Sequence, residues 1–278
     1  MAELITGDNL SSAWIRGLEH LVATGNGKDV NLSVGFTGAA EDVAIRAALD
    51  EFIAEWRSQK RKSKIYPVAT VANTLFPQAL YRGEPGEAAR MRLYRLHERS
   101  MRVQRRLREK ETYFNRFVNW PGKENINQLE HVIARLETQL AAGDRKGPLS
   151  SAYELAASVP DDLAREGDLR VYAPGIDNSP IGFPCLSQVS FTLVHEKIHL
   201  TALYRNQDFI SRAYGNYVGL ARLGTFIGRE VGCELGEVLC VASHADAGLS
   251  QYGKGRVQGL VERCKIAGAG EERALSRV

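Results

Sequence analysis

The stretch over residues 182–223 gathers the side chains whose types and order are best suited to chemistry. Cys185 follows a proline, and Arg205, Asp208 and Asn216 come later in the same stretch. A cysteine thiolate adds to electron-poor carbon atoms and is favoured near cationic side chains. An arginine can hold a phosphate through two parallel hydrogen bonds, and an asparagine amide both donates and accepts. Taken singly, Cys185 is explained as a buried thiol, Arg205 with Asp208 as a salt bridge, and Asn216 as a helix cap. The functional interpretation therefore depends on the spacing of all four residues together.

The sequence HEKIH at residues 195–199 has the spelling of a zinc-hydrolase motif. In that motif two histidines one helical turn apart bind the metal, and the glutamate polarises the metal-bound water. The flanking residues alternate roughly between apolar and polar types, which favours two strands joined by a charged turn at His195, Glu196 and Lys197. On strands, His195 and His199 would lie roughly 13 Å apart, too far to share one tetrahedral zinc. We therefore expect no metal, and a zinc metallohydrolase using His195, Glu196 and His199 is kept as an alternative.

The composition is that of a globular protein, with 278 residues, 44% of them apolar and 25% charged. The formal net charge of +3 does not by itself indicate a nucleic-acid partner, and the arginine-rich helix expected over residues 87–110 is interpreted as a solvated surface. We expect one domain over residues 1–278, since no repeat, long linker or low-complexity segment divides the chain. Hydrophobic periodicity predicts further helices over residues 13–21, 41–56, 125–140, 216–231 and 257–266, and strands over residues 31–36, 169–172 and 237–243. A proline-rich loop over residues 174–184 is expected to deliver Cys185.

The four cysteines, Cys185, Cys233, Cys240 and Cys264, form no CxxC pair and no regular framework, which favours reduced thiols. Charged residues interrupt the N-terminal segment 1–21, so neither a signal-peptide core nor a membrane span is expected there. We therefore expect a cytoplasmic protein without a membrane partner.

The spacing around Cys185 resembles that of the folate-dependent thymidylate synthases and pyrimidine nucleotide hydroxymethylases. That family has Pro-Cys-His at its nucleophile, then a pair of strands, an Arg-Ser-x-Asp block and a Phe-Asn pair. This chain has Pro-Cys at 184–185, two predicted strands, Arg-Asn-Gln-Asp at 205–208 and Asn216, and the separations agree without a gap. The resemblance extends more loosely to residues 66–83 and 113–136 and is weakest over residues 1–60 and 249–278.

The resemblance implies an α+β fold in which a large mixed β-sheet is packed with helices, in the manner of a thymidylate synthase. It also implies a two-fold homodimer formed through the sheet, because members of the family bury one face of the sheet against a second copy. The implied partners are a pyrimidine nucleotide monophosphate and a folate, and no nucleic acid.

The implied reaction transfers a one-carbon unit from 5,10-methylenetetrahydrofolate to C5 of dUMP or UMP, giving a methylated or hydroxymethylated pyrimidine. In the family pattern Cys185 is the nucleophile that adds to C6, and Arg205 is the phosphate ligand. Asn216 is the base reader, because an amide can donate to O4 and accept from N3–H of uracil, whereas cytosine is better met by a carboxylate. Asp208 matches the folate contact, and Tyr113 matches a tyrosine near the pyrimidine.

Other positions depart from the family pattern. Leu186 stands where the family has a histidine, and Asn206 replaces the phosphate-binding serine. Asn73 falls approximately on the glutamate that organises proton transfer, and an amide cannot relay a proton as a carboxylate does. Asp246 falls approximately where the family has a histidine that binds the sugar hydroxyl, so the sequence does not decide between deoxyribose and ribose. In the family a second subunit contributes arginines to the site, and Arg170 is the nearest candidate for that role here. A divergent enzyme is expected, and a nucleotide-binding paralogue without turnover is the alternative.

Overall fold

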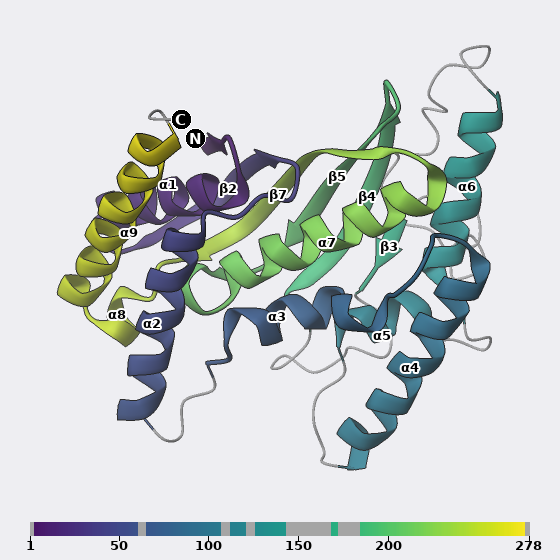
Figure 1. Ribbon diagram of the computed structural model, residues 1–278. Coiled ribbons are helices and arrows are strands. Elements are labelled where there is room, and N and C mark those ends of the chain that lie inside the picture. Colours follow the sequence, from purple (N-terminus) through teal and green to yellow (C-terminus); the bar gives the residue numbers. More distant parts are fainter. Residues whose placement is uncertain are drawn as a thin grey trace. The chain divides into compact units, whose positions relative to one another are not determined.

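The computed structural model describes residues 3–60, 65–106, 112–120, 126–142, 168–171 and 184–275. Within these residues the chain is of the α+β type, with a mixed β-sheet packed with helices, as the sequence predicts (Figure 1). The predicted loop over residues 174–184, apart from Pro184, and the end of the predicted basic helix, residues 107–110, lie outside the described residues. No helix in the described ranges is both long and apolar enough to cross a membrane.

The sheet contains parallel and antiparallel pairs. Its strands in the described residues are β1 (Glu3–Gly7), β2 (Lys28–Thr37), β3 (Asp168–Arg170), β4 (Leu186–Val194), β5 (Lys197–Tyr204), β6 (Gln207–Asp208) and β7 (Glu234–Asp246). Their order is β1-β2-β7-β5-β4-β3, and the short β6 pairs with β7. β1 is parallel to β2 and β6 to β7, whereas β2 with β7 and β3 with β4 are antiparallel.

The helices differ widely in length. They are α1 (Leu10–Ala23), α2 (Val43–Gln59), α3 (Val68–Leu75), α4 (Glu87–Arg106), α5 (Tyr113–Val118), α6 (Gln128–Ala142), α7 (Tyr214–Val231), α8 (Leu249–Tyr252) and α9 (Lys254–Leu275). A 3-10 turn, η1 (Gln78–Leu80), precedes α4, and a π-helical turn, η5 (Phe209–Ala213), leads directly into α7.

Most elements predicted from hydrophobic periodicity are confirmed, with their ends shifted. The predicted helices correspond to α1, α2, α4, α6, α7 and α9, and the predicted strands to β2, β3, β4, β5 and β7. The structure also contains elements that were not predicted from the sequence, namely β1, β6, α3, α5 and α8. In addition, α9 begins before and ends after the predicted helix over residues 257–266. β1 is held by its pairing with β2, and no local pattern in the sequence encodes that partner.

The chain forms two compact units. Unit 1 comprises Met1–Ala72, Tyr204–Ala221 and Glu237–Val278, and unit 2 comprises Asn73–Leu203 and Arg222–Gly236.

In unit 1, α1 packs on β1 and β2, and α9 packs against α1 and α2 (Figure 1). Asn9 caps α1 with its side chain, which fixes where the helix begins. The buried indole of Trp14 donates a hydrogen bond of 2.7 Å to the carbonyl of Phe209. A Cβ on Gly17 would lie 2.6 Å from the Phe209 ring, so glycine lets α1 approach η5. Both contacts hold the segment that directly follows Asp208.

In unit 2, an aromatic cluster forms the core beside α4 and α5. The Phe76 ring lies 5.7 Å from Phe114, 6.3 Å from Tyr81 and 4.9 Å from Phe226, measured between centroids. Phe76 directly follows α3, Phe114 lies in α5 and Phe226 lies in the part of α7 that belongs to this unit, so the cluster joins these three segments.

Candidate active site

Four predicted site residues of unit 1 lie on neighbouring pieces of backbone. β6 pairs in parallel with the end of β7, which sets Asp208 opposite Asp246. Arg205 and Asn206 form the link from β5 to β6, so they adjoin the same end of β7. The structure thus brings the predicted phosphate, folate and sugar residues of this unit into one neighbourhood.

Asn206 is held by a residue that the sequence prediction missed. Its side-chain oxygen lies 2.9 Å from Nδ1 of His244 on β7. Because an amide oxygen only accepts, Nδ1 of His244 carries the hydrogen and donates it. The arrangement leaves the NH₂ group of Asn206 as a donor beside Arg205. The available sequence signal is weak: His244 and Asp246 share one side of a strand because they are two positions apart.

Asp208 is the N-cap of η5. Its Oδ1 accepts hydrogen bonds from the backbone N–H groups of Ile210 at 3.1 Å and Ser211 at 2.7 Å. Burial raises the pKa of this carboxyl group, the hydrogen bonds from Ser211 oppose the rise, and the charge of Asp246 adds to it. The carboxyl group therefore holds its proton more tightly than an exposed aspartate does.

The side chain of Asp246 contacts neighbouring residues at the end of β7. Its Oδ2 lies 3.4 Å from the ammonium group of Lys28, and its Oδ1 accepts a 2.6 Å hydrogen bond from the N–H of Gly248. Gly248 has a φ of 68°, a left-handed conformation that glycine adopts without steric cost. Both contacts fix the position of this carboxylate.

Asn216 lies in the first turn of α7 and is 4% exposed. In the part of the chain that the structure describes, its side-chain amide makes no hydrogen bond. It is not a helix cap, because η5 runs directly into α7 and is itself capped by Asp208. The residue is buried as a whole, but its amide atoms are not among the fully buried side-chain atoms that lack a hydrogen-bond partner in the described residues. The amide therefore reaches the protein surface and is available to a ligand.

The cysteines differ in their surroundings. Cys185 stands directly before β4 with its side chain half-buried. Burial raises the pKa of Cys264 to about 12 and that of Cys240 further. Burial and the nearby charge of Glu196 also raise the pKa of Cys233. Since the thiolate is the nucleophile, these three cysteines are poorly suited to covalent catalysis.

The remaining predicted residues lie in unit 2. Asn73 is exposed on α3, and its side-chain oxygen is 3.5 Å from Nη1 of Arg222. Tyr113 begins α5 with a half-buried side chain, and Arg170 lies in β3 opposite Gln188. The predicted site therefore divides between the two units, and its assembly around Cys185 stays a prediction.

The HEKIH sequence forms a hairpin turn, as the sequence predicts. β4 ends at Val194 and β5 begins at Lys197, so the turn is one residue shorter than expected. His195 and Glu196 have φ values of 49° and 59°, which suit a tight two-residue hairpin. The helix that a zinc-hydrolase motif requires is not formed at these residues. Among the described residues, no three histidine, cysteine, aspartate or glutamate side chains are placed to hold a metal ion.

Comparison with known proteins gives distant relatives. No family model matches the sequence. The chain is 28% identical over 134 residues to a protein of Methanosarcina mazei named "Putative thymidylate synthase". This match covers 48% of this chain and 51% of that protein. A protein of the same name from Methanococcoides burtonii is 26% identical over 135 residues, which are 48% of this chain and 51% of that protein, and one from Methanocaldococcus jannaschii is 25% identical over 125 residues, which are 45% of this chain and 49% of that protein. The chain spans about half the length of these curated relatives. It is distantly related to proteins that bear this name.

Proposed function

We propose that the protein is a transferase of the thymidylate synthase kind, which moves a one-carbon unit from 5,10-methylenetetrahydrofolate to C5 of a uridine-type nucleotide. The names of the distant relatives support this proposal, as does the gap-free spacing of Cys185, Arg205, Asp208 and Asn216. The observation that most supports it is the side-chain amide of Asn216, which belongs to a residue only 4% exposed and makes no hydrogen bond in the described residues.

In the proposed complex, Asn216 reads the base. Its NH₂ group donates to O4 of uracil and its oxygen accepts from N3–H, so both halves of the amide find partners. Cytosine presents the reverse pattern, a donor at N4 and an acceptor at N3, so an amide held in the uracil-binding orientation would face it with donor against donor and acceptor against acceptor. Asn216→Asp should therefore weaken binding of dUMP or UMP roughly 10-fold or more and favour the cytidine nucleotide.

Cys185 is the proposed nucleophile. Its thiolate forms a bond to C6, and the electrons of the C5–C6 double bond shift toward O4, which makes C5 nucleophilic. The carbon–carbon bond at C5 forms as the one-carbon unit opens its bond to one folate nitrogen, and the C5 proton then leaves to water, because the amide of Asn73 is not a base. The second carbon–nitrogen bond breaks to release the folate, and the carbon takes up a hydride from the folate or the oxygen of a water. Loss of the Cys185 thiolate then restores the double bond. Tyr113 is proposed to lie near the pyrimidine.

Arg205 and Asn206 are the proposed phosphate ligands. The guanidinium group binds two phosphate oxygens in parallel, and the NH₂ group of Asn206, oriented by His244, donates to a third. Asp246 is proposed to face the sugar. A carboxylate can accept a hydrogen bond from the single free hydroxyl of deoxyribose or from the two of ribose, so dUMP and UMP are both candidates.

Asp208 has chemistry that fits a folate ring. Its Oδ1 is used by the cap of η5, and we assign its other oxygen to the N–H groups of the pterin. Bound methylenetetrahydrofolate supplies the carbon and, for methylation, also a hydride, leaving as dihydrofolate, whereas hydroxymethylation takes up one water instead. In either case the role of Asp208 is to orient the ring.

The proposed enzyme is one thymidylate-synthase-like domain over residues 1–278, and it acts as a two-fold homodimer in which Arg170 is lent to the phosphate site of the second copy. This arrangement is taken from the distant family relationship.

The proposal is tested by trapping the covalent complex. The protein is incubated with 5-fluoro-dUMP or 5-fluoro-UMP and methylenetetrahydrofolate, then digested and analysed by mass spectrometry. Because C5 carries fluorine in place of hydrogen, elimination is blocked and the nucleotide should stay attached to Cys185, together with the folate. The nucleotide that forms the adduct identifies the sugar, and the product from the unfluorinated nucleotide distinguishes methylation from hydroxymethylation.

Cys185→Ser is the control, which should bind nucleotide without forming an adduct. Nucleotide binding by the wild-type protein without an adduct would leave the non-catalytic paralogue as the function. Stoichiometric zinc in the purified protein that is lost in His199→Ala would instead favour the metallohydrolase.

A further inference from the structure

The helix α4 (Glu87–Arg106) carries a large share of the positive charge of the chain. Its sequence contains seven arginines and two glutamates, which give it a formal charge of +5. Because the whole chain has a formal net charge of +3, the residues outside α4 are together slightly negative. The positive charge is therefore concentrated on one helix of unit 2, and none of its arginines has a part in the proposed one-carbon transfer.

Four of these arginines share one side of the helix. They are Arg92, Arg95, Arg99 and Arg102, and all four are exposed. At 3.6 residues per turn they fall within an arc of roughly 80° and extend roughly 15 Å along the helix axis. The opposite side of α4 is buried, and Leu93 and Met101 are at most 2% exposed. We call these four residues the arginine stripe.

Little within the described part of the protein neutralises the arginine stripe. Arg102 lies 2.7 Å from Glu98, but both side chains are about two-thirds exposed, so this ion pair is weak. The other three arginines of the stripe form no ion pair in the described residues. Arg90, outside the stripe, instead binds Glu130 and Glu230. Like charges three or four residues apart on a helix repel one another, and a bound polyanion would relieve that repulsion.

The surroundings of the stripe favour nucleic acid over other polyanions. A helix that lies in a membrane surface needs an open apolar face, whereas the apolar face of α4 is buried. Protein partners are usually held by clustered aromatic or aliphatic anchors. The large apolar side chains exposed on the described part of α4 are Met91 and Val103, twelve residues apart. A row of arginines without such anchors matches a row of phosphates, which guanidinium groups bind through paired hydrogen bonds.

We propose that the arginine stripe binds the phosphate backbone of double-stranded nucleic acid without reading its sequence. A duplex carries one phosphate per roughly 1.7 Å of its axis, so each arginine of the stripe finds a phosphate. Single strands are usually held by stacking on exposed aromatic rings, and the one tyrosine of α4, Tyr94, is instead bound to Glu130. This proposal replaces the interpretation of α4 as a solvated surface, and it is independent of the proposed one-carbon transfer.

Fluorescence anisotropy of a labelled DNA duplex of about 20 base pairs, titrated with the whole protein, tests the proposal. The logarithm of the association constant should fall with the logarithm of the salt concentration, with a slope of about −3 to −4 for four phosphate contacts. A stripe variant combines Arg92→Gln, Arg95→Gln and Arg99→Gln. It should bind at least tenfold more weakly at about 50 mM salt, with a slope of about −1.

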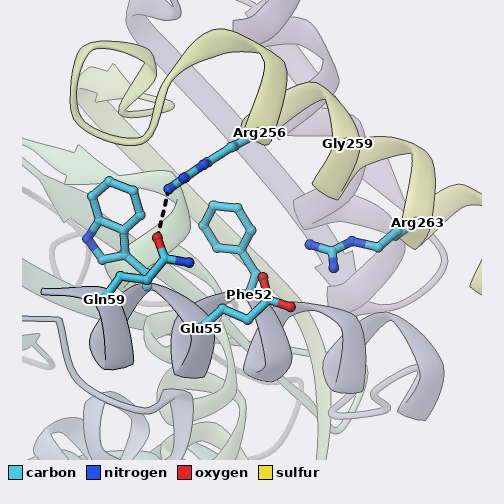
Figure 2. A pocket seen from close by; sticks show the side chains of 7 residues that line it. Phe52, Glu55, Gln59, Arg256, Gly259 and Arg263 are labelled. Atoms are coloured by element: carbon cyan, nitrogen blue, oxygen red, sulfur yellow. Dashed lines mark hydrogen bonds between the residues drawn. The ribbon is translucent and has the colours of Figure 1, made fainter.

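A matched variant removes three arginines from unit 1. It combines Arg57→Gln, Arg256→Gln and Arg263→Gln at exposed positions of α2 and α9, where Arg256 and Arg263 line a small cavity (Figure 2). This variant loses the same formal charge as the stripe variant but should bind the duplex as the wild type does. The melting temperature of the stripe variant should stay or rise, because glutamine is as good a helix former as arginine and the repulsion is removed.

The fluoronucleotide adduct on Cys185 should form in the wild type and in both variants. Failure of the proposed one-carbon transfer would remove the adduct from all three proteins and leave duplex binding unaffected, so the two proposals fail independently.

Other polyanions complete the test. A single strand of the same length, vesicles containing phosphatidylserine and a polyglutamate peptide should each bind more weakly than the duplex at equal charge concentration. The proposal is overturned if the duplex does not bind at about 50 mM salt, or if the stripe variant and the matched variant lose affinity equally. It is also overturned if the single strand, the vesicles or the peptide bind as tightly as the duplex.

Discussion

At the scale of single residues, the hydrogen bond between Asn206 and His244 changes how the phosphate block is interpreted. In the sequence, Asn206 is a departure from the serine of the family it resembles. In the structure, His244 fixes the amide so that its NH₂ group is the remaining donor. Under the proposed function, the NH₂ group of Asn206 would take the place of the serine hydroxyl as the phosphate donor, with His244 orienting it.

His244→Ala should weaken binding of dUMP or UMP by roughly 2- to 10-fold, the range expected when one neutral hydrogen bond no longer orients a ligand group. Deoxyuridine and uridine lack the phosphate, so their affinities should not change. Calorimetric titration with the nucleotide and with the nucleoside shows whether the loss of affinity depends on the phosphate. His20→Ala, which removes another histidine of unit 1, is the control and should alter neither. An equal loss for nucleoside and nucleotide would contradict the role assigned to His244.

Asp208 gives a prediction about pH. Because burial raises its pKa, the folded state binds the proton more tightly than the unfolded state does. Stability is therefore lost as the pH rises from the ordinary aspartate pKa through the higher folded pKa, and the loss is complete above it. Asp208→Asn can still cap η5 but cannot ionise. Ser211, Arg212, Tyr252 and Asp246 are the other groups that act on this carboxyl group.

Relative to wild type, Asp208→Asn should therefore gain stability between about pH 3 and about pH 7. Urea unfolding of both proteins at the two pH values measures the change. A difference in unfolding free energy that is the same at both values would show that Asp208 does not titrate abnormally.

At the scale of elements, the carboxylate of Glu230 joins three segments of unit 2. It lies in the last turn of α7 with a side chain that is 0% exposed. It accepts hydrogen bonds from Tyr81, from the N–H of Gly86 at 2.9 Å and from Arg90 at 2.8 Å. Arg90 also binds Glu130 of α6 at 2.8 Å. The network thereby fixes the start of α4 against α6 and the end of α7.

Glu230→Ala should lower the free energy of unfolding by about 3–5 kcal/mol, because it leaves a buried guanidinium and two other donors without their shared acceptor. Glu98→Ala removes the exposed ion pair with Arg102 on α4 and should change stability by less than about 1 kcal/mol. Urea unfolding compares the two. A loss below about 1 kcal/mol for Glu230→Ala would mean that water replaces the carboxylate without cost.

At the scale of the whole molecule, unit 1 is assembled from stretches that are distant in the sequence. β2 near the N-terminus pairs with β7, for example at Val34 and Cys240, and β1 is added in parallel at its other edge. Such non-local pairing leaves no local trace, which is why the strand order does not follow from the pattern of any single segment.

The homodimer inferred from the family resemblance is a prediction at this scale. Sedimentation equilibrium or light scattering should give a mass near twice the 30.7 kDa of one chain over a wide range of protein concentration. A mass of one chain at all concentrations would contradict the dimer and, with it, the proposal that Arg170 serves a second copy.

The sequence by itself determined the elements whose pattern is local. The amphipathic helix at α2, the buried helix at α7 and the charged hairpin turn at His195 and Glu196 all follow from the period of their apolar residues. The tertiary structure decided what depends on partners far along the chain. It paired Asn206 with His244, set Asp208 opposite Asp246 and left the side-chain amide of the buried residue Asn216 without a hydrogen bond in the described residues. Spacing along a chain specifies which residue types are present, whereas burial and hydrogen bonding arise only when distant segments pack together.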